Sequence, residues 1–231
     1  MSEFVFPAPA TPSVAISGSS SRFPVRRVFC VGRNYASHAR EMGGDPQREP
    51  PFFFTKPADA VVAASGAVPY PPSTQDLHHE VELVVALGQG GANVDAGRAL
   101  ELVWGYGVGL DLTRRDLQAA AKDTGRPWDM GKGFDASAPC GALHPVGEVG
   151  HPAKGRIWLE VNGELRQEGN LDELIWPIAD VIAHLSRFVT LAPGDLIYSG
   201  TPSGVAALNP GDRVRGGVEG VGAFELEIGP R

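Results

Sequence analysis

Two glutamates stand at the start of the most apolar strand-like segment of the sequence, HEVELVVALG at residues 79–88. Side chains alternate across a β-strand, so Glu80 and Glu82 share one face while Val81, Leu83 and Val85 occupy the other. Two carboxylates about 7 Å apart beside an apolar run raise each other's pKa, and an unpaired buried carboxylate is costly. The pattern therefore predicts a neighbouring positive charge, which could be an arginine, a lysine or a metal ion.

A third carboxylate, Asp111, ends another strand-like segment within VGLDLT, residues 108–113. Three carboxylates from two strand ends suit Mg²⁺, which takes few protein oxygens and keeps several waters. His78 and His79 directly precede Glu80, and imidazole ligands would favour Zn²⁺ or Fe²⁺ instead. The alternative without chemistry is that both glutamates line a solvated strand face, and spacing alone leaves these interpretations open.

Three further segments carry reactive or ligand-binding side chains. His38 and Glu41 are three residues apart on a predicted helix and share a face, and a histidine oriented by a carboxylate is a general base for water. Lys132 lies between glycines that let the backbone approach a ligand, although it lacks phosphate-loop spacing. Thr201, in YSGTPSGV, would lie in a tight turn whose backbone N–H groups could bind an anion. Taken alone, each segment also fits an ordinary surface pair, loop or turn.

Composition narrows the class of protein. The 231 residues are 42% hydrophobic and 20% charged, which is typical of a soluble globular protein with one sizeable core. A net charge of −7 without a long basic run argues against nucleic acid as a partner. Two cysteines are too few for a disulfide scaffold, no apolar run reaches the roughly 20 residues of a membrane span, and the N-terminus lacks a signal-peptide pattern. We therefore expect a cytoplasmic protein without a membrane partner.

Glycine and proline punctuate many short strand-like runs, which favours an α+β fold dominated by antiparallel sheet. Strands are predicted at residues 25–32, 50–57, 79–88 and 107–113 and in the glycine-rich tail at 211–229. Asn162-Gly163 is the strongest hairpin signal in the chain.

Helical spacing and capping residues predict the remaining elements. Helices are predicted at residues 34–44, 96–106, 114–125 and 173–189. Thr113 is the expected cap of the third of these helices. Residues 1–22 are expected to form an extended arm that leads into a single domain, residues 23–231.

Seven segments, in order, resemble motifs of the fumarylacetoacetate hydrolase family: CVGRNYASHAREMG, PPFFFTKP, LHHEVELVVALG, GYGVGLDLTRRDLQ, WDMGKGFD, VNGELRQEG and PGDLIYSGTPSGV. They run from about residue 27 to residue 205, and the glycine-rich tail is also similar, so the resemblance covers nearly the whole expected domain. Within the family the chain is most similar to the small single-domain acylpyruvate hydrolases. The resemblance implies a mixed β-sandwich roll, usually a homodimer, with the site at one end of the β structure.

The resemblance also implies roles for particular residues. The ligands of Mg²⁺ or Mn²⁺ would be Glu80, Glu82 and Asp111. His38 and Glu41 match the family's water-activating pair, and Lys132 matches its metal-adjacent lysine. The positions that match substrate-facing residues are Arg33, Arg115, Gln118 and Thr201.

The activity implied is metal-dependent hydrolysis of a C–C bond in a small anionic 2,4-diketo acid. Fumarylpyruvate, cleaved to fumarate and pyruvate in gentisate-type degradation of aromatic compounds, is the expected substrate. A broader acylpyruvate hydrolase or an oxaloacetate decarboxylase remains open, since stabilisation of an enolate serves each reaction. A metal-stabilised binding protein without turnover is a further alternative, against which the presence of both His38 and Glu41 argues.

Overall fold

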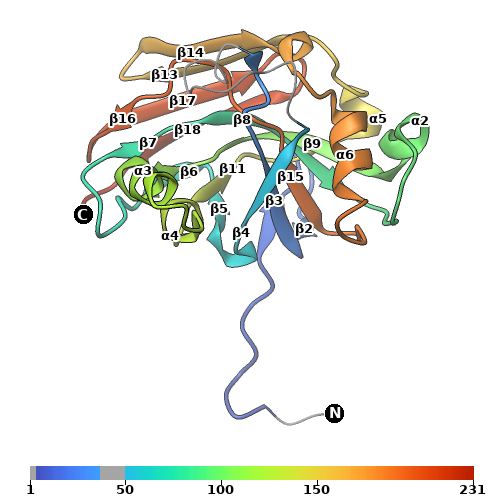
Figure 1. The fold of residues 1–231 in the computed structure, drawn as a ribbon, viewed down its shortest axis with the longest axis horizontal. Helices are drawn as coiled ribbons and strands as arrows, with labels where there is room; N and C mark the ends of the chain where they lie inside the picture. The colour runs from blue at the N-terminus through green and yellow to red at the C-terminus, as the bar shows by residue number, and fades with distance from the viewer. Residues whose placement is uncertain (1–3, 37–49) are drawn as a thin grey trace.

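The computed structural model describes residues 4–36 and 50–231, and β-strands dominate it (Figure 1). Within these residues the largest sheet contains, in spatial order, β4 (Phe52–Lys56), β3 (Arg27–Gly32), β15 (Asp195–Tyr198), β8 (Val81–Leu87), β9 (Val103–Leu110), β11 (Ala138–Cys140) and β5 (Val61–Ala63), with β12 (His144–Pro145) beside β9. The second large sheet contains β14 (Glu164–Asn170), β13 (Arg156–Val161), β17 (Arg213–Val218), β18 (Gly222–Ile228) and β6 (Ser65–Val68). A small sheet joins β10 (Thr113–Arg114), β7 (Leu77–His78) and β16 (Ala207–Leu208).

The two large sheets pack on each other with the main core between them. Val81, Leu83 and Val85 of β8 belong to the same buried cluster as Leu159 of β13 and Leu226 of β18. The other face of β8 packs into a second cluster, which includes Cys30 of β3 and Tyr198 of β15. Most neighbouring strands are antiparallel, whereas β15 runs parallel to β3, β5 to β11 and β6 to β18. The predicted α+β fold with a sandwich of curled sheets is confirmed.

The predicted hairpin is present and joins β13 to β14. Asn162 has φ 54° and Gly163 has φ 82°, so both turn residues adopt the left-handed conformation that a two-residue hairpin turn of this type requires. The tail forms β17 and β18, as predicted, and these two strands pair along their whole length. The predicted strands at 25–32, 50–57 and 79–88 correspond to β3, β4 and β8.

The helices are short, and several predicted boundaries are wrong. The described helical segments are α2 (Ala96–Ala99), η2 (Leu100–Leu102), α3 (Arg115–Asp123), α4 (Asp129–Lys132), α5 (Val146–Val149), α6 (Ile178–Leu185), η1 (Ala58–Ala60) and η3 (Leu171–Glu173). None of these helices in the described ranges is long and apolar enough to cross a bilayer. The predicted helix at 34–44 lies mostly outside the described residues.

Pairing with β8 explains why the helix predicted at 96–106 stops early. Leu87 pairs with Val103 and Ala86 with Gly105, so the end of the predicted helix is the start of β9. Thr113 lies in β10, where its hydroxyl donates to the carbonyl of Asp111. It is therefore not the cap of α3, whose N-cap position is Arg114.

The helix predicted at 173–189 begins only at Ile178. Pro177 occupies its N-cap position, and a proline disfavours helical backbone in the residue before it. α6 therefore starts directly after Pro177, five residues later than predicted.

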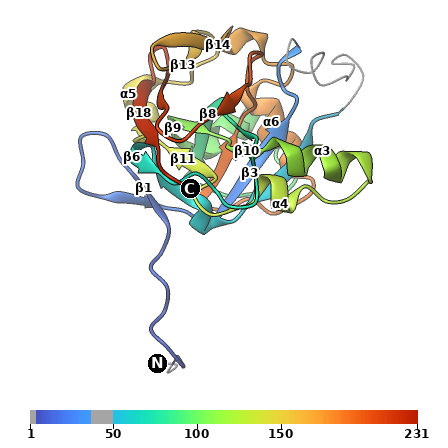
Figure 2. The same ribbon diagram turned by 90° about the vertical axis from the view of Figure 1, so that its left-hand side faces the viewer.

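The N-terminal segment has two parts. β1 (Ser13–Ala15) pairs with β2 (Arg22–Pro24), and Val14 is buried with Phe23 in the second core cluster. Residues 4–12, which precede β1, run away from the body in both views (Figures 1 and 2). The boundary between an arm of residues 1–22 and a domain of residues 23–231 stays a prediction.

Candidate active site

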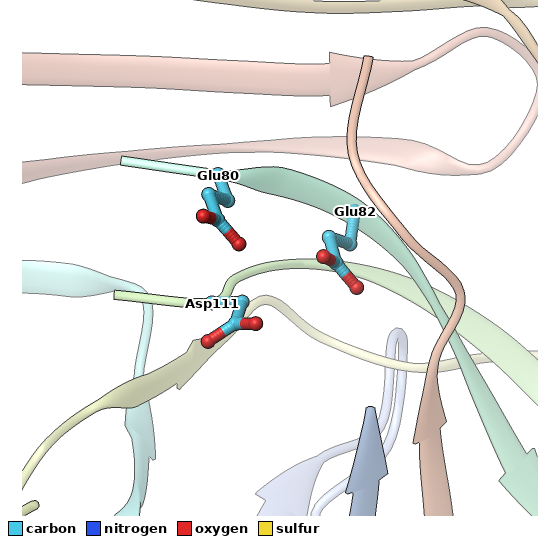
Figure 3. A group of neighbouring side chains, drawn as sticks. All are labelled: Glu80, Glu82 and Asp111. Carbon is cyan, nitrogen blue, oxygen red and sulfur yellow. The ribbon is translucent and has the colours of Figure 1, made fainter. Parts of the chain in front are cut away.

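Three carboxylates meet where β8 begins and β9 ends. The two strands are antiparallel, with Val81 opposite Leu110, so Glu80 and Glu82 lie next to Asp111, which follows β9. One oxygen from each of the three carboxylates lies within 4.8 Å of the others, and the side chains point toward one another (Figure 3). Glu80 is 5% exposed, Glu82 2% and Asp111 1%. The interpretation that the glutamates line a solvated strand face is therefore wrong.

Three cationic side chains surround two of these carboxylates. Lys132, at the end of α4, places Nζ 2.7 Å from Glu80 Oε2 and 2.7 Å from Asp111 Oδ2. Arg115, at the start of α3, pairs with Glu80 Oε1 at 2.5 Å. Lys56, at the end of β4, forms an ion pair with Asp111, in which its Nζ lies 2.8 Å from Oδ1. The two groups are not oriented for a hydrogen bond. Burial lowers the pKa of Lys132, but Asp111 and Glu80 outweigh this effect and leave that pKa raised.

Glu82 differs from its two neighbours because it forms no ion pair with any described residue. Its Oε2 accepts a hydrogen bond from the Gly200 N–H at 2.8 Å. Burial raises the pKa of Glu82 well above the usual value, Asp111 and Glu80 raise it further, and the Gly200 hydrogen bond and Lys132 only partly oppose this. An additional cation beside Glu82 would relieve this repulsion.

The donor set fits a hard dication. It consists of carboxylate oxygens alone, which Mg²⁺ and Mn²⁺ prefer. The lysines and the arginine contact carboxylate oxygens that each keep further lone pairs for a metal. Neither His78 nor His79 joins the group, because His79 Nδ1 bonds Gln167 Oε1 at 2.8 Å and His78 Nε2 bonds Asp76 Oδ1 at 2.8 Å. Burial lowers the pKa of His79 to about 4, so its ring is neutral.

One pocket brings the carboxylates together with all the predicted residues that the structure describes. Besides the three carboxylates, these lining residues are Arg33, Arg115, Gln118, Lys132 and Thr201. Gln118 is buried, and its Oε1 accepts a hydrogen bond from Arg115 Nη1 at 2.6 Å. The Thr201 hydroxyl donates to the Val81 carbonyl at 2.8 Å. The turn after β15 is therefore tied to the strand that carries Glu82.

His38 and Glu41 lie outside the described residues, so the predicted general-base pair has no position in the structure. The chain that leads into this segment is anchored close to the site. Asn34 Nδ2 donates to the carbonyls of Ser199 at 2.8 Å and Trp176 at 3.0 Å, and its Oδ1 accepts from the Trp176 N–H. Arg33, directly before it, has φ 56° and lines the pocket.

Sequence reasoning missed two polar residues that support the site. Besides its ion pair with Asp111, Lys56 donates to the carbonyls of Leu112 and Lys132. Gln167, in β14, accepts from the Val81 N–H at 3.1 Å and donates to Thr201 Oγ1 at 2.8 Å. Alternation along β4 could have revealed Lys56, whereas Gln167 reaches the site only through packing of the second sheet on the first.

Aromatic side chains were missed as well. Phe52, Phe54 and Trp128 line the same pocket as the carboxylates. Phe52 and Phe54 are two residues apart on β4, so strand alternation places both rings on the face of Lys56. Trp128 directly precedes α4, which carries Lys132.

Comparisons with known proteins agree with this geometry. The family model described as fumarylacetoacetate (FAA) hydrolase C-terminal matches residues 27–228. A fumarylpyruvate hydrolase of a Ralstonia species is 46% identical over 186 residues, which are 80% of this chain and 96% of that protein. A mitochondrial oxaloacetate tautomerase of Rattus norvegicus is 41% identical and aligns over 88% of this chain and 91% of its own length. The crystal structure of a Pseudomonas aeruginosa fumarylpyruvate hydrolase with Mn²⁺ and pyruvate is 51% identical and superposes with a TM-score of 0.96, covering 99% of this chain and 100% of that one.

Proposed function

Because this chain belongs to the fumarylacetoacetate hydrolase family, we propose that it is a metal-dependent hydrolase that cleaves fumarylpyruvate to fumarate and pyruvate. The observation that carries the proposal is the buried group Glu80, Glu82 and Asp111, in which the repulsion between the carboxylates is only partly offset at Glu82. The Pseudomonas aeruginosa relative, whose structure contains Mn²⁺ and pyruvate, supports both the cofactor and one of the two products.

Glu80, Glu82 and Asp111 would hold Mg²⁺ or Mn²⁺. When bound, the metal would act as a Lewis acid that withdraws electron density from a 2-keto acid. The charges of the site support an anionic substrate. The three carboxylates and the three cations paired with them cancel, so a dication together with Arg33 leaves the pocket positive, which suits the two carboxylates of fumarylpyruvate.

The remaining steps belong to side chains of this chain. His38, oriented by Glu41, takes a proton from a water molecule, whose oxygen bonds the 4-keto carbon. Lys132 or Gln118 donates a hydrogen bond to the oxyanion that develops there. The bond between the 3- and 4-carbons then breaks, its electron pair stays with the pyruvate half, and that half takes up a proton. Arg33 or Arg115 would bind the distal carboxylate of the substrate.

A second candidate is a related keto-acid activity. The oxaloacetate tautomerase relative shows that similar chains act on a C4 keto acid, and oxaloacetate decarboxylation needs the same electron sink without attack by water. A broader acylpyruvate hydrolase is the other candidate, and it would differ in the acyl group that it accepts.

The test compares substrates and one variant with a matched control. With Mg²⁺ or Mn²⁺, kcat/KM is measured from the loss of enol absorbance for fumarylpyruvate, acetylpyruvate and oxaloacetate, and fumarylpyruvate should be preferred. His38→Ala should lower kcat by about 10²–10⁴-fold and leave Mn²⁺ affinity unchanged. His144→Ala removes a histidine that lies 3.8 Å from Glu148 outside the pocket, and it should change neither quantity. Higher kcat/KM on oxaloacetate would favour the second candidate instead.

Two coarser properties complete the proposal. The buried, free thiols of Cys30 and Cys140 support a reducing compartment, in agreement with the cytoplasm. A homodimer is proposed on the family resemblance, and light scattering of the purified protein would measure its mass directly.

A further inference from the structure

The inner face of β4 carries an aromatic cluster as well as a lysine. Alternation places Phe52, Phe54 and Lys56 on one face of the strand, and Lys56 reaches Asp111. Trp128 joins the two phenylalanines from the turn before α4. Its ring centroid lies 5.5 Å from that of Phe52, at an interplanar angle of 86°, and 6.1 Å from that of Phe54. These three residues are called the aromatic wall below.

Neighbouring groups hold the aromatic wall in place. Phe52 lies opposite Gly32 in the β3–β4 register, and a Cβ at Gly32 would come 2.0 Å from Phe52 Cζ, so the ring occupies the space that a side chain at position 32 would need. The ring of Phe54 lies 4.9 Å from Lys132 Nζ. α4, which follows Trp128, packs closely on α3, since a Cβ at Gly131 would come 2.9 Å from the Gln118 backbone nitrogen.

Burial divides the pocket into a floor and a rim. The carboxylates, Gln118, Lys132 and Thr201 are all at most 5% exposed. The aromatic wall, Arg33 and Arg115 are partly exposed. A substrate whose 2-keto acid end binds at the buried carboxylates must therefore direct its acyl end toward the rim, beside the aromatic rings and the two arginines.

We propose that the aromatic wall of Phe52, Phe54 and Trp128 determines specificity by selecting a flat, unsaturated acyl group over a saturated one of equal length and charge. This inference rests on the proposed function, and it names the part of the substrate that the rim recognises. A conjugated C=C–C=O unit is planar and offers a face to an aromatic ring, whereas a flexible CH₂–CH₂ chain must lose rotational freedom to do so. The distal carboxylate is common to both kinds of acyl group, so the arginines do not distinguish them.

The experiment uses the metal-loaded enzyme and two substrates that differ only in saturation. These are fumarylpyruvate and succinylpyruvate, with acetylpyruvate as a short reference. Trp128→Leu should lower kcat/KM for fumarylpyruvate about 5- to 10-fold and for succinylpyruvate less than about 2-fold. Trp128→Phe keeps a ring and should retain most of the preference. The control, Phe188→Leu, removes an exposed ring outside the pocket and should leave all three values unchanged.

The possible results distinguish failure of the aromatic-wall proposal from failure of the proposed hydrolase function. Equal losses on both dicarboxylate substrates, or an unchanged ratio, would overturn the role of the aromatic wall while leaving the hydrolase function intact. If the wild-type enzyme cleaves none of the three substrates, both the proposed function and the selection fall. Should Trp128→Leu not fold, as judged by its Mn²⁺ binding and circular dichroism, Phe52→Leu supplies the same comparison.

Discussion

The two ends of β15 lie next to two buried carboxylates whose charges are balanced in different ways. At the start of the strand, Asp195 has a fully buried side chain that pairs with Arg27 at 2.7 Å and Arg26 at 3.1 Å. Its Oδ2 also accepts a hydrogen bond from the Ala192 N–H at 2.9 Å. Beyond the other end of the strand, the Gly200 N–H donates to Glu82, which has no cation of its own among the described residues.

The difference separates a structural carboxylate from the one that we propose binds a metal. The arginines beside Asp195 are half-exposed, and their guanidinium groups contact a carboxylate that is fully buried. These contacts join β3 to β15 where the pairing of the two strands begins. Around Glu82, by contrast, the cations contact Glu80 and Asp111, and the pKa of Glu82 stays raised. A buried carboxylate without a local cation is costly to the fold, which indicates that a ligand compensates for it.

The largest effect is expected when the unbalanced carboxylate is removed. Glu82→Ala should abolish Mn²⁺ uptake and lower kcat/KM at least about 10³-fold, because the groups that stabilise charge in the transition state depend on the metal. Electron paramagnetic resonance of Mn²⁺ and the enol assay measure these effects. Glu101→Ala, which breaks only an exposed pair with Arg98, is the matched control. A Glu82→Ala enzyme that binds one Mn²⁺ per chain with wild-type affinity would contradict the ligand assignment.

Removing the balanced carboxylate should change stability instead of activity. Asp195→Ala leaves Arg26, Arg27 and the Ala192 N–H without their acceptor, and breaking a buried pair from one side costs about 3–5 kcal/mol. We expect the lower part of that range, since both arginines can turn to water. Urea unfolding at saturating Mn²⁺ measures the free energy of unfolding, and kcat per folded molecule should stay unchanged. A loss of Mn²⁺ affinity in this variant would remove the distinction between the two sites.

The distinction between these sites could be predicted only in part from the sequence. Strand alternation was sufficient to place Glu80 and Glu82 on one face, because burial of the opposite face fixes the register of β8. Asp111 stood out because it ends a second strand-like segment, and Lys132 because it lies between glycines, while the family resemblance assigned both to one site. The structure places Lys132 against Glu80 and Asp111. No local pattern relates Arg27 to Asp195, since 168 residues separate them and only the β3–β15 pairing joins them.

Short elements were the least predictable part of the fold. Residues 103–106 have helical spacing after α2, yet they form β9 because β8 offers a pairing edge there. Thr113 has the side chain of a helix cap, but its hydroxyl bonds the Asp111 carbonyl instead. In both places a tertiary partner outweighs a local preference, and such partners are invisible in a single sequence.

Metal binding should raise stability through the site that contains Glu82 and not through the Asp195 site. At Mn²⁺ concentrations 100-fold above Kd, the metal should stabilise the wild-type protein by about 2.7 kcal/mol. Glu82→Gln should show no such stabilisation, whereas Asp195→Ala should show all of it. Denaturant unfolding with EDTA or MnCl₂ measures each difference. Stabilisation of Glu82→Gln by the metal would place the ion elsewhere.

The same variant predicts a pH dependence with a definite sign. Because the folded pKa of Glu82 is raised, its contribution to stability without metal is fully present below the unfolded value, about 4.3, and is lost as pH rises through the folded pKa. The metal binds the deprotonated form, so stabilisation by Mn²⁺ should grow over that same pH range. In Glu82→Gln, the loss of stability with rising pH in the absence of metal should be smaller. An equal decline in both proteins would assign it to other groups.

The smallest effect should come from the outer cation of the balanced site. Arg26 is 49% exposed and makes one contact to Asp195, whereas Arg27 is 31% exposed and contacts both carboxylate oxygens and the Thr190 carbonyl. Arg26→Ala should therefore cost less than about 1 kcal/mol, as exposed ion pairs do, and Arg27→Ala should cost more. Combining each change with Asp195→Ala in a double-mutant cycle isolates the pairwise free energy. Equal coupling for both arginines would contradict the prediction that Arg27 is the main partner of Asp195.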